Sequence, residues 1–282
     1  MAAGIIFALC CVFFSSANDF IFKLYAVNSK KRGILIFWIG IIMTIFLFRM
    51  PQADFNLQAT LFYGLLSGFF SVAANILLIE GMTHQSAGFS SLIYRLNLIP
   101  TVLGGVIILN ESLKMIQWCG IVCSLVAIIL FGIADSKVNR WNKAAKAGLI
   151  MVIIAALLRA AMGITYKYGF LHGADKNWVP WLNGICWISG GLLYAMLREK
   201  DYNFMNRTTL KYGFFSGFFV LGIVVFMALS VFHGDASVVL PIAQMSFPLT
   251  FLLGHFILKE KCNIFHFFSL GLAIAAVYLL SR

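Results

Sequence analysis

Charged side chains are scarce in this sequence, and acidic ones are the scarcest. Only 10 of 282 residues are Asp or Glu, all charged residues make up 11%, and 61% of the chain is hydrophobic. A chain of this size with so little charge cannot bury its apolar side chains inside one soluble core. Most of its surface must therefore contact membrane lipid.

The sequence also lacks the ten-residue alternation that is typical of transmembrane barrel strands. Its apolar runs are continuous, which indicates helices. A helix needs about 20 residues to cross about 30 Å of hydrocarbon. We predict an all-α integral membrane protein with ten spans, at approximately 4–24, 33–49, 60–81, 87–109, 115–134, 147–168, 178–197, 210–232, 237–257 and 263–281.

Several chemical motifs are missing as well. The six cysteines form no CxxC pair or His/Cys cluster, so we expect neither a metal site nor a cofactor. There is no nucleophile elbow and no HExxH pair, so we expect no catalytic residues and no enzyme activity. The net charge of +11 comes from basic residues in short links between spans and not from a soluble basic domain, so we expect no nucleic-acid partner.

The chain is an internal duplication. Between positions 63 and 111, a shift of 149 gives 15 identities in 49 pairs, against about four expected by chance. The first helix of each half aligns at a shift of 144. We predict two five-helix repeats, at 1–135 and 147–282, joined by a basic linker at 136–146.

Because each repeat has an odd number of spans, the second repeat must enter the membrane from the opposite side. Inverted repeats of this kind are typical of secondary transporters with a site near the midplane. The links after odd-numbered spans hold 13 of the 21 Lys and Arg residues, and the opposite links and the C-terminus hold four. The positive-inside rule therefore predicts that both termini lie outside the cytoplasm, in a protein of the cytoplasmic membrane.

The third and fourth spans of each repeat share a pattern of a small residue, a proline and a Leu-x-Glu exit. The first repeat reads Ala87, Pro100 and Leu109-Asn110-Glu111, and the second reads Ala236, Pro248 and Leu258-Lys259-Glu260. This pattern resembles the EamA-type repeat of the drug/metabolite transporter superfamily, over nearly the whole chain. The resemblance implies transport of a small-molecule substrate without identifying it. The two prolines are 148 apart where their surroundings are 149 apart, so the two kinks need not be equivalent.

Ionisable residues inside lipid-embedded helices are costly, so each is a candidate site residue. Arg159 lies about eleven residues into a span of about twenty, too deep for its side chain to reach the interface. Its counterpart in the first repeat is Ser15, so the charge belongs to one half alone. Arg159 either lines the substrate path or forms a structural ion pair with Asp19 or Glu80.

Arg95 is a second candidate for substrate binding, and in the predicted orientation it shares the cytoplasmic half with Asp19 and Glu80. These three groups could simply neutralise one another. Alternatively, Asp19 or Glu80 exchanges a proton that is coupled to substrate movement. Neutral candidates for substrate binding, which could equally be contacts between helices, are Asn18, Asn75, Tyr94, Asn97 and Gln244.

Two further pairs have a structural interpretation. Glu111 and Glu260 follow spans four and nine, where a carboxylate can cap the positive end of the next helix. Lys23 and Lys167 lie near helix ends and can extend to the interface.

We predict a secondary active transporter that moves a small organic metabolite by alternating access. Arg159 and Arg95 favour slightly an anionic or zwitterionic substrate. The alternative is a proton-coupled exporter of cationic or aromatic compounds held by Asp19, Glu80 and aromatic faces. A non-transporting scaffold fits inverted duplication less well. The sequence does not determine the direction of transport, the coupling ion or whether the protein forms a homodimer.

Overall fold

The structure is a computed structural model that describes residues 2–28, 31–48, 55–84, 93–135, 143–200, 203–258 and 264–282. Over these residues the chain is helical and forms no strand. The helices of the first repeat are α1 (Ala2–Asn28), α2 (Arg32–Leu47), α3 (Leu57–His84), α5 (Leu98–Ile108) and α6 (Met115–Asp135). Those of the second are α7 (Lys143–Leu171), α8 (Trp178–Tyr194) with the π-helical turn η1 (Ala195–Glu199), α9 (Arg207–His233), α10 (Ala236–Ala243), α11 (Phe247–Leu258) and α12 (Ile264–Leu280).

These helices confirm the ten predicted spans, with α5 inside the fourth span and α10 and α11 together making the ninth. Among the described residues, four segments are both long and apolar enough to cross a membrane, namely Ala2–Phe22, Leu57–Gly81, Lys146–Leu171 and Arg207–His233. Shorter apolar helices, such as Arg32–Leu47 and Ile264–Leu280, complete the bundle. Many large apolar side chains on its outside are exposed, as lipid contact requires.

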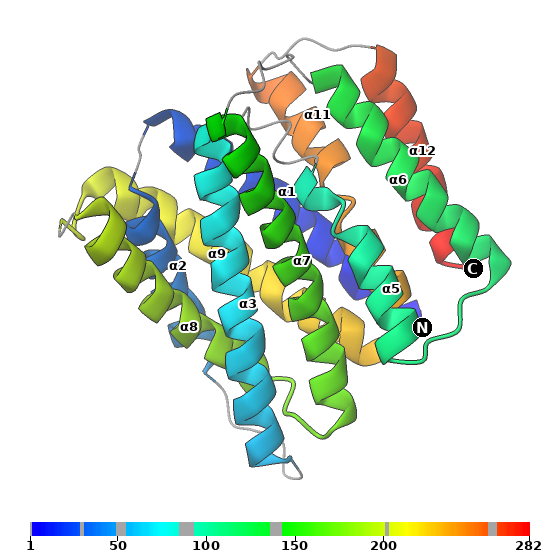
Figure 1. Cartoon of the computed structure of the whole chain (residues 1–282), viewed down its shortest axis with the longest axis horizontal. Helices are drawn as coiled ribbons and strands as arrows, with labels where there is room; N and C mark the ends of the chain where they lie inside the picture. The colour runs from blue at the N-terminus through cyan, green and yellow to red at the C-terminus, as the bar shows by residue number, and fades with distance from the viewer. Residues whose placement is uncertain are drawn as a thin grey trace.

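The two repeats interleave and do not form separate lobes. Helix α3 packs on α7 and α8, and its counterpart α9 packs on α1 and α2. Helices α2 and α8 pack on each other, as do α6 and α12, and each pair consists of repeat counterparts (Figure 1). The third helix of each repeat is therefore held by the first two helices of the other.

Glycines make this close packing possible. A Cβ atom at Gly64 or Gly68 of α3 would come within 2.6 Å of a side chain of α8. At the counterparts Gly213 and Gly217 of α9, it would come within 2.8 Å of a side chain of α2. These GxxxG pairs therefore act as contact points between helices of different repeats.

The fourth and ninth spans are both broken, and the breaks lie at matching positions. In the fourth span, Leu96 and Asn97 form a turn before α5, and in the ninth span residues 244–246 form a turn between α10 and α11. At the shift of 149, Leu96 and Asn97 correspond to Met245 and Ser246. The two breaks are thus equivalent.

The prolines follow the breaks. Pro100 is the third residue of α5 and Pro248 is the second residue of α11. A proline is tolerated there because the first N–H groups of a helix have no intrahelical partner. Each proline therefore lies in the first turn of the second half of a broken span and does not kink a continuous helix. The difference between their spacing of 148 and the repeat shift of 149 thus does not change the position of either break.

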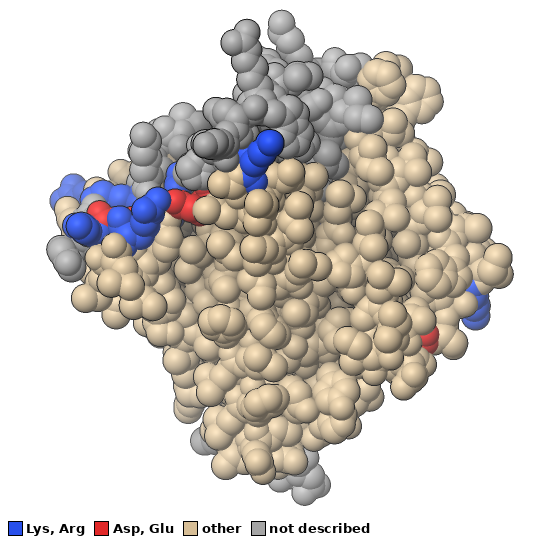
Figure 2. All heavy atoms as spheres, in the orientation of Figure 1, with Lys and Arg blue, Asp and Glu red and all other residues tan. Residues whose placement is uncertain are grey.

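Charge is segregated along the bundle. Lys and Arg side chains gather at one end, next to a broad face that carries almost none (Figure 2). The two ends of the chain lie close together, away from this basic end (Figure 1). Beside the C-terminus, Lys114 Nζ donates to the Arg282 carbonyl at 3.0 Å. An even number of spans requires this arrangement of the termini.

Candidate functional site

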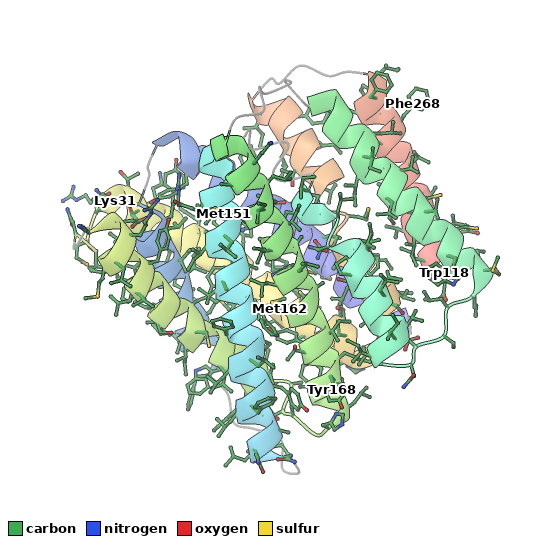
Figure 3. All side chains as sticks on the ribbon, in the orientation of Figure 1. Lys31, Trp118, Met151, Met162, Tyr168 and Phe268 are labelled. Atoms are coloured by element: carbon green, nitrogen blue, oxygen red, sulfur yellow. The ribbon has the colours of Figure 1, made fainter. Side chains whose placement is uncertain are left out.

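Arg159 lies near the middle of α7, and its guanidinium faces sulfur atoms. Nη1 is 3.7 Å from Met162 Sδ, and Nη2 is 3.8 Å from Met227 Sδ. Met162 lies at the centre of the bundle (Figure 3). Thioether sulfur is a weak acceptor, and no carboxylate among the described residues lies within ion-pair distance of Arg159. The structure therefore does not bring Arg159 to Asp19 or Glu80.

Asp19 instead pairs with Arg95. Arg95 Nη2 donates to Asp19 Oδ2 at 2.8 Å, with side chains that are 12% and 35% exposed respectively. Arg95 Nη1 donates to the Gln244 carbonyl and to Ser246 Oγ, both at 2.9 Å. Ser246 Oγ in turn donates to Asp19 Oδ2 at 3.2 Å. We call Asp19, Arg95 and Ser246 the charged clasp.

The charged clasp holds the second break in place. Gln244 is the C-cap of α10, so the Arg95 cation meets a carbonyl at the negative end of this half-helix. Asp19 comes from α1 and Arg95 from the turn before α5. Three segments far apart in sequence are thus joined at one broken helix.

The duplication assigns each residue of the charged clasp a counterpart without charge. Asp19 corresponds to Gly163 at the shift of 144, and Arg95 and Gln244 correspond at the shift of 149. Ser246 corresponds to Asn97. The matching positions therefore hold a glycine on α7 and two amides in the turns of the broken spans, where the charged clasp has an ion pair and a serine.

In this second region, buried polar atoms lack partners. Asn97 is 0% exposed, and neither Oδ1 nor Nδ2 has a hydrogen-bond partner within the described part of the chain. The same holds for Arg159 Nε and for the hydroxyl of Tyr166, which is 1% exposed. We call Asn97, Arg159 and Tyr166 the unpaired cluster. Each such atom costs about 1–3 kcal/mol, and among the described residues Asn183 Oδ1, Glu199 Oε2 and Ser237 Oγ also lack partners. The unpaired cluster is the candidate site because it contains Arg159, the charge near the middle of α7.

The members of the unpaired cluster belong to two elements that lie side by side. Tyr166 is about two turns from Arg159 on α7. Helix α5 packs on α7, where a Cβ at Gly104 would lie 2.9 Å from Ile164. Asn97 lies in the turn that leads into α5, where its N–H donates to the Tyr94 carbonyl at 3.2 Å.

The remaining amides predicted for the site make hydrogen bonds within or between helices. Asn18 Oδ1 accepts a hydrogen bond from Ser216 Oγ at 2.5 Å, which joins α1 to α9. Asn75 Nδ2 donates to the Ser71 carbonyl of its own helix at 2.8 Å. Gln244 contributes its backbone carbonyl to the charged clasp.

Glu80 lies apart from these groups, at the basic end of the bundle. Its carboxylate is 3.0 Å from Arg198 Nη2 and 3.5 Å from Arg32 Nη1, and it accepts a hydrogen bond from the Tyr194 hydroxyl at 2.6 Å. Of the three groups expected to neutralise one another, only Asp19 and Arg95 are thus brought together.

Glu111 caps a helix, but not the one that follows it. Its Oε1 and Oε2 accept hydrogen bonds from the Ala236 and Ser237 N–H groups at 2.7 and 2.8 Å, at the start of α10. Asn110 adopts a left-handed conformation (φ 53°) that ends α5 and turns the chain there. The prediction of a capping role was right, and the prediction of the next helix was wrong because the repeats interleave. Glu260 lies outside the described residues.

Of the two lysines expected to extend to the interface, the structure describes the side chain of Lys167 alone. Lys167 Nζ donates to the Gly234 carbonyl at 2.7 Å, at the C-terminal end of α9. The side chain of Lys23 lies outside the described part of the structure.

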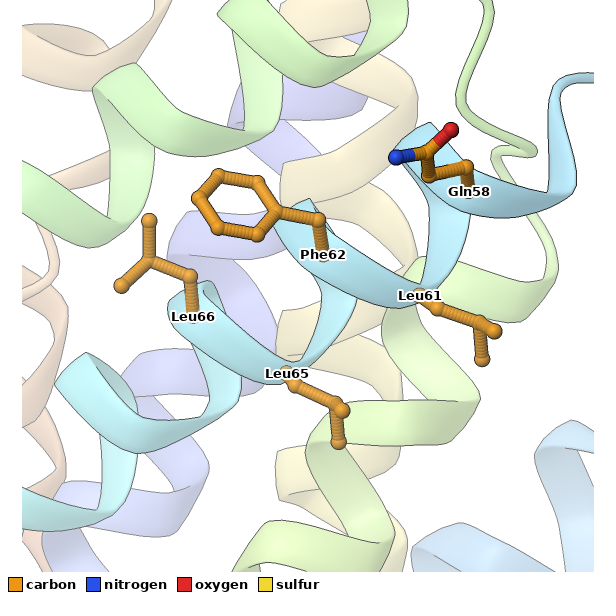
Figure 4. Close-up of a pocket in the computed structure, with 5 residues that line it drawn as sticks. All are labelled: Gln58, Leu61, Phe62, Leu65 and Leu66. Atoms are coloured by element: carbon orange, nitrogen blue, oxygen red, sulfur yellow. The ribbon is translucent and has the colours of Figure 1, made fainter.

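A hollow of about 480 Å³ opens on the outer face of α3 (Figure 4). Its lining comes from one helix and consists of Gln58, Leu61, Phe62, Leu65 and Leu66. No residue of the charged clasp or the unpaired cluster lines it. An apolar hollow along a span suits lipid chains better than a polar metabolite.

Inverted repeats with two broken spans at the centre define a multi-pass membrane transporter fold. The model of the EamA-like transporter family matches residues 2–133 and 146–282, and the chain belongs to this family, which is part of the drug/metabolite transporter superfamily. It is a family of transporters and not of enzymes. No curated protein matches the sequence. A solved structure titled only "Crystal structure of protein" has the same fold, with a TM-score of 0.79 and 12% identity over 99% of this chain and 96% of that one.

Proposed function

We propose that this protein is a secondary active transporter that carries a small organic anion or zwitterion across the cytoplasmic membrane. The observation that carries the proposal is Arg159, a charge near the middle of a span that meets two thioethers. A charge in a low-dielectric site is costly without a counter-ion. A negatively charged substrate group supplies that counter-ion.

Alternating access fits the arrangement of the helices. Each repeat contributes one broken span, and broken spans are where transporters expose backbone groups to a substrate at the midplane. Because α3 and α9 each pack on the other repeat, movement of one repeat necessarily repacks the other. Rocking of the repeats then opens the centre to each side in turn.

The alternative, a proton-coupled exporter of cations, has less support. It needs Asp19 or Glu80 as a carboxylate that is free to exchange a proton. Both accept charged hydrogen bonds, from Arg95 and from Arg198 respectively. Each carboxylate therefore already has an arginine partner in this structure.

Purified protein in liposomes tests the proposal. We expect saturable uptake of organic anions that Arg159→Lys weakens, because the charge stays but the planar fork is lost. Arg159→Gln is expected to abolish uptake, and Arg198→Gln, which removes an exposed arginine, is the matched control. Normal anion uptake by Arg159→Gln would refute the proposal. Uptake of amines that depends on Asp19 would favour the alternative.

A second experiment concerns orientation. The basic end of the bundle predicts that the C-terminus lies outside the cytoplasm. A C-terminal fluorescent reporter that matures only in the cytoplasm should stay dark, while the same reporter inserted at the linker 136–146 should be bright. The reverse pattern would overturn the orientation.

A further inference from the structure

The charges at the centre of the bundle bear on the net charge of the substrate. In the charged clasp, Arg95 and Asp19 neutralise each other at 2.8 Å. That leaves Arg159 as the uncompensated charge among the described central residues. One positive charge is balanced best by a single negative charge. A phosphate monoester carries about −1.5 to −2 at neutral pH and would leave a negative excess, whereas a carboxylate carries −1 and fits the planar guanidinium.

The unpartnered atoms identify a second group on the substrate. Arg159 Nε, Asn97 Nδ2 and the Tyr166 hydroxyl are donors that a carboxylate can satisfy. Asn97 Oδ1 is an acceptor without a partner in the described part of the chain, and a carboxylate cannot donate to it. A hydroxyl group on the substrate can. An ammonium group also donates, but it would make the substrate net neutral and leave the Arg159 charge unbalanced.

We propose that Asn97, Arg159 and Tyr166 bind a hydroxy-monocarboxylate, with Arg159 on the carboxylate and Asn97 on the hydroxyl. This inference rests on the proposed transport function and narrows its substrate class. The thioethers of Met162 and Met227, each 2% exposed, lie beside the guanidinium and contact the carbon skeleton. Flexible methionines adapt to skeletons of different shape.

Two variants separate ligand binding from structural support. Asn97→Leu keeps the shape and removes both unpartnered amide atoms, and Tyr166→Phe removes one unpartnered hydroxyl. If these atoms serve a ligand, the unliganded variants melt at the wild-type temperature or above it, because no internal hydrogen bond is lost. Ligand binding falls in both.

The chain offers a matched control for each variant. Asn183 is also 0% exposed and its Oδ1 also lacks a partner in the described part of the chain, but its Nδ2 donates to the Val179 carbonyl and to Ser67 Oγ, both at 3.0 Å. Tyr25 is 3% exposed, and its hydroxyl donates to the Lys31 carbonyl at 2.6 Å. Asn183→Leu and Tyr25→Phe should lower the melting temperature and leave ligand preference unchanged.

The experiment measures thermal shift and liposome uptake with four-carbon and six-carbon probes. At each length the probes are the 2-hydroxy monocarboxylate, the plain monocarboxylate, the 2-amino monocarboxylate and the hydroxy dicarboxylate. We expect wild-type protein to bind the 2-hydroxy monocarboxylate at least tenfold more tightly than the other three. Asn97→Leu should reduce this preference over the plain acid to less than twofold, and Tyr166→Phe should weaken binding of both acids severalfold.

Three results would overturn the inference: tighter binding of a dicarboxylate or amino acid, unchanged preference in Asn97→Leu, or a loss of melting temperature in Asn97→Leu as large as in Asn183→Leu. Failure of the proposed function looks different, because no small solute would then be taken up. Uptake with a different preference refutes only the substrate class.

Discussion

The charged clasp and the unpaired cluster stand near matching positions of a duplicated fold, yet their polar groups have opposite fates. In the charged clasp, Asp19 and Ser246 both contact Arg95, and the bonds run between segments far apart in sequence. In the unpaired cluster, Arg159 of the second repeat and Asn97 of the first keep buried atoms without partners in the described structure. The polar groups of the charged clasp join helices, and those of the unpaired cluster are the ones that we propose bind a ligand.

The difference teaches how a duplicated scaffold acquires one specialised site. Both repeats need a broken span, and both breaks expose backbone groups that must be satisfied. The Arg95 side chain satisfies such groups at the break between α10 and α11. Gly163 and Gln244 carry no charge where their counterparts Asp19 and Arg95 do, while Arg159 stands opposite the uncharged Ser15, so the two regions differ in charge within one duplicated scaffold.

The largest expected effect is a loss of stability when the charged clasp is broken, with no such loss when Arg159 is replaced. Asp19→Asn should lower the free energy of unfolding by about 2 kcal/mol, because Arg95 keeps its buried charge without a carboxylate. The loss is moderated because Asp19 is 35% exposed. Arg159→Gln should cost no stability. Chemical denaturation of the detergent-solubilised protein measures both.

The double variant Asp19→Asn with Arg95→Gln is the control, and it should recover part of the loss since it removes both charges. Equal destabilisation by Arg159→Gln and Asp19→Asn would erase the distinction between the two regions.

A smaller effect is expected from placing a carboxylate in the unpaired cluster. Gly163→Asp puts an acid four residues after Arg159 on the same helix face, where the two side chains can pair. Anion binding should fall about tenfold, which is about 1.4 kcal/mol. Gly163→Asn is the control, because a Cβ there meets Leu240 Cδ1 at 2.6 Å in either variant. Equal loss in both variants would mean that crowding, and not charge, blocks the site.

Glu111→Gln tests the cap that supports the charged clasp from the other end of α10. The variant keeps the shape but weakens two bonds to the helix start, so we expect a loss of about 0.3–1 kcal/mol in stability. Ligand-induced thermal shift should persist. Its disappearance in a folded variant would place Glu111 in the binding site.

The smallest effect is expected at the basic end and gives a baseline for surface charge. Arg198 is 68% exposed, so Arg198→Gln should leave the free energy of unfolding almost unchanged. Wild-type stability should also be nearly insensitive to salt. A loss as large as that of Asp19→Asn would show that the Glu80 contacts matter as much as the charged clasp.

Much of the fold could be predicted because the relevant signals are local or repeated. The matched glycines of α3 and α9 and the depth of Arg159 needed no partner to be recognised. The unpaired cluster was only partly predictable. Tyr166 was missed because a tyrosine in an apolar helix carries no signal of its own, although its seven-residue spacing from Arg159 puts both on one face of α7.

The sequence alone determined the class of protein. The hydropathy of each span depends only on the residues in that span, and the duplication is found by comparing the two halves of the sequence. Which polar groups meet was decided by the tertiary structure. The bond from Arg95 to Asp19 joins residues 76 apart, that from Arg95 to Gln244 joins residues 149 apart, and that from Glu111 to Ala236 joins residues 125 apart. Contacts at such separations depend on how the two repeats interleave, and interleaving is a property of packed helices that no single segment encodes.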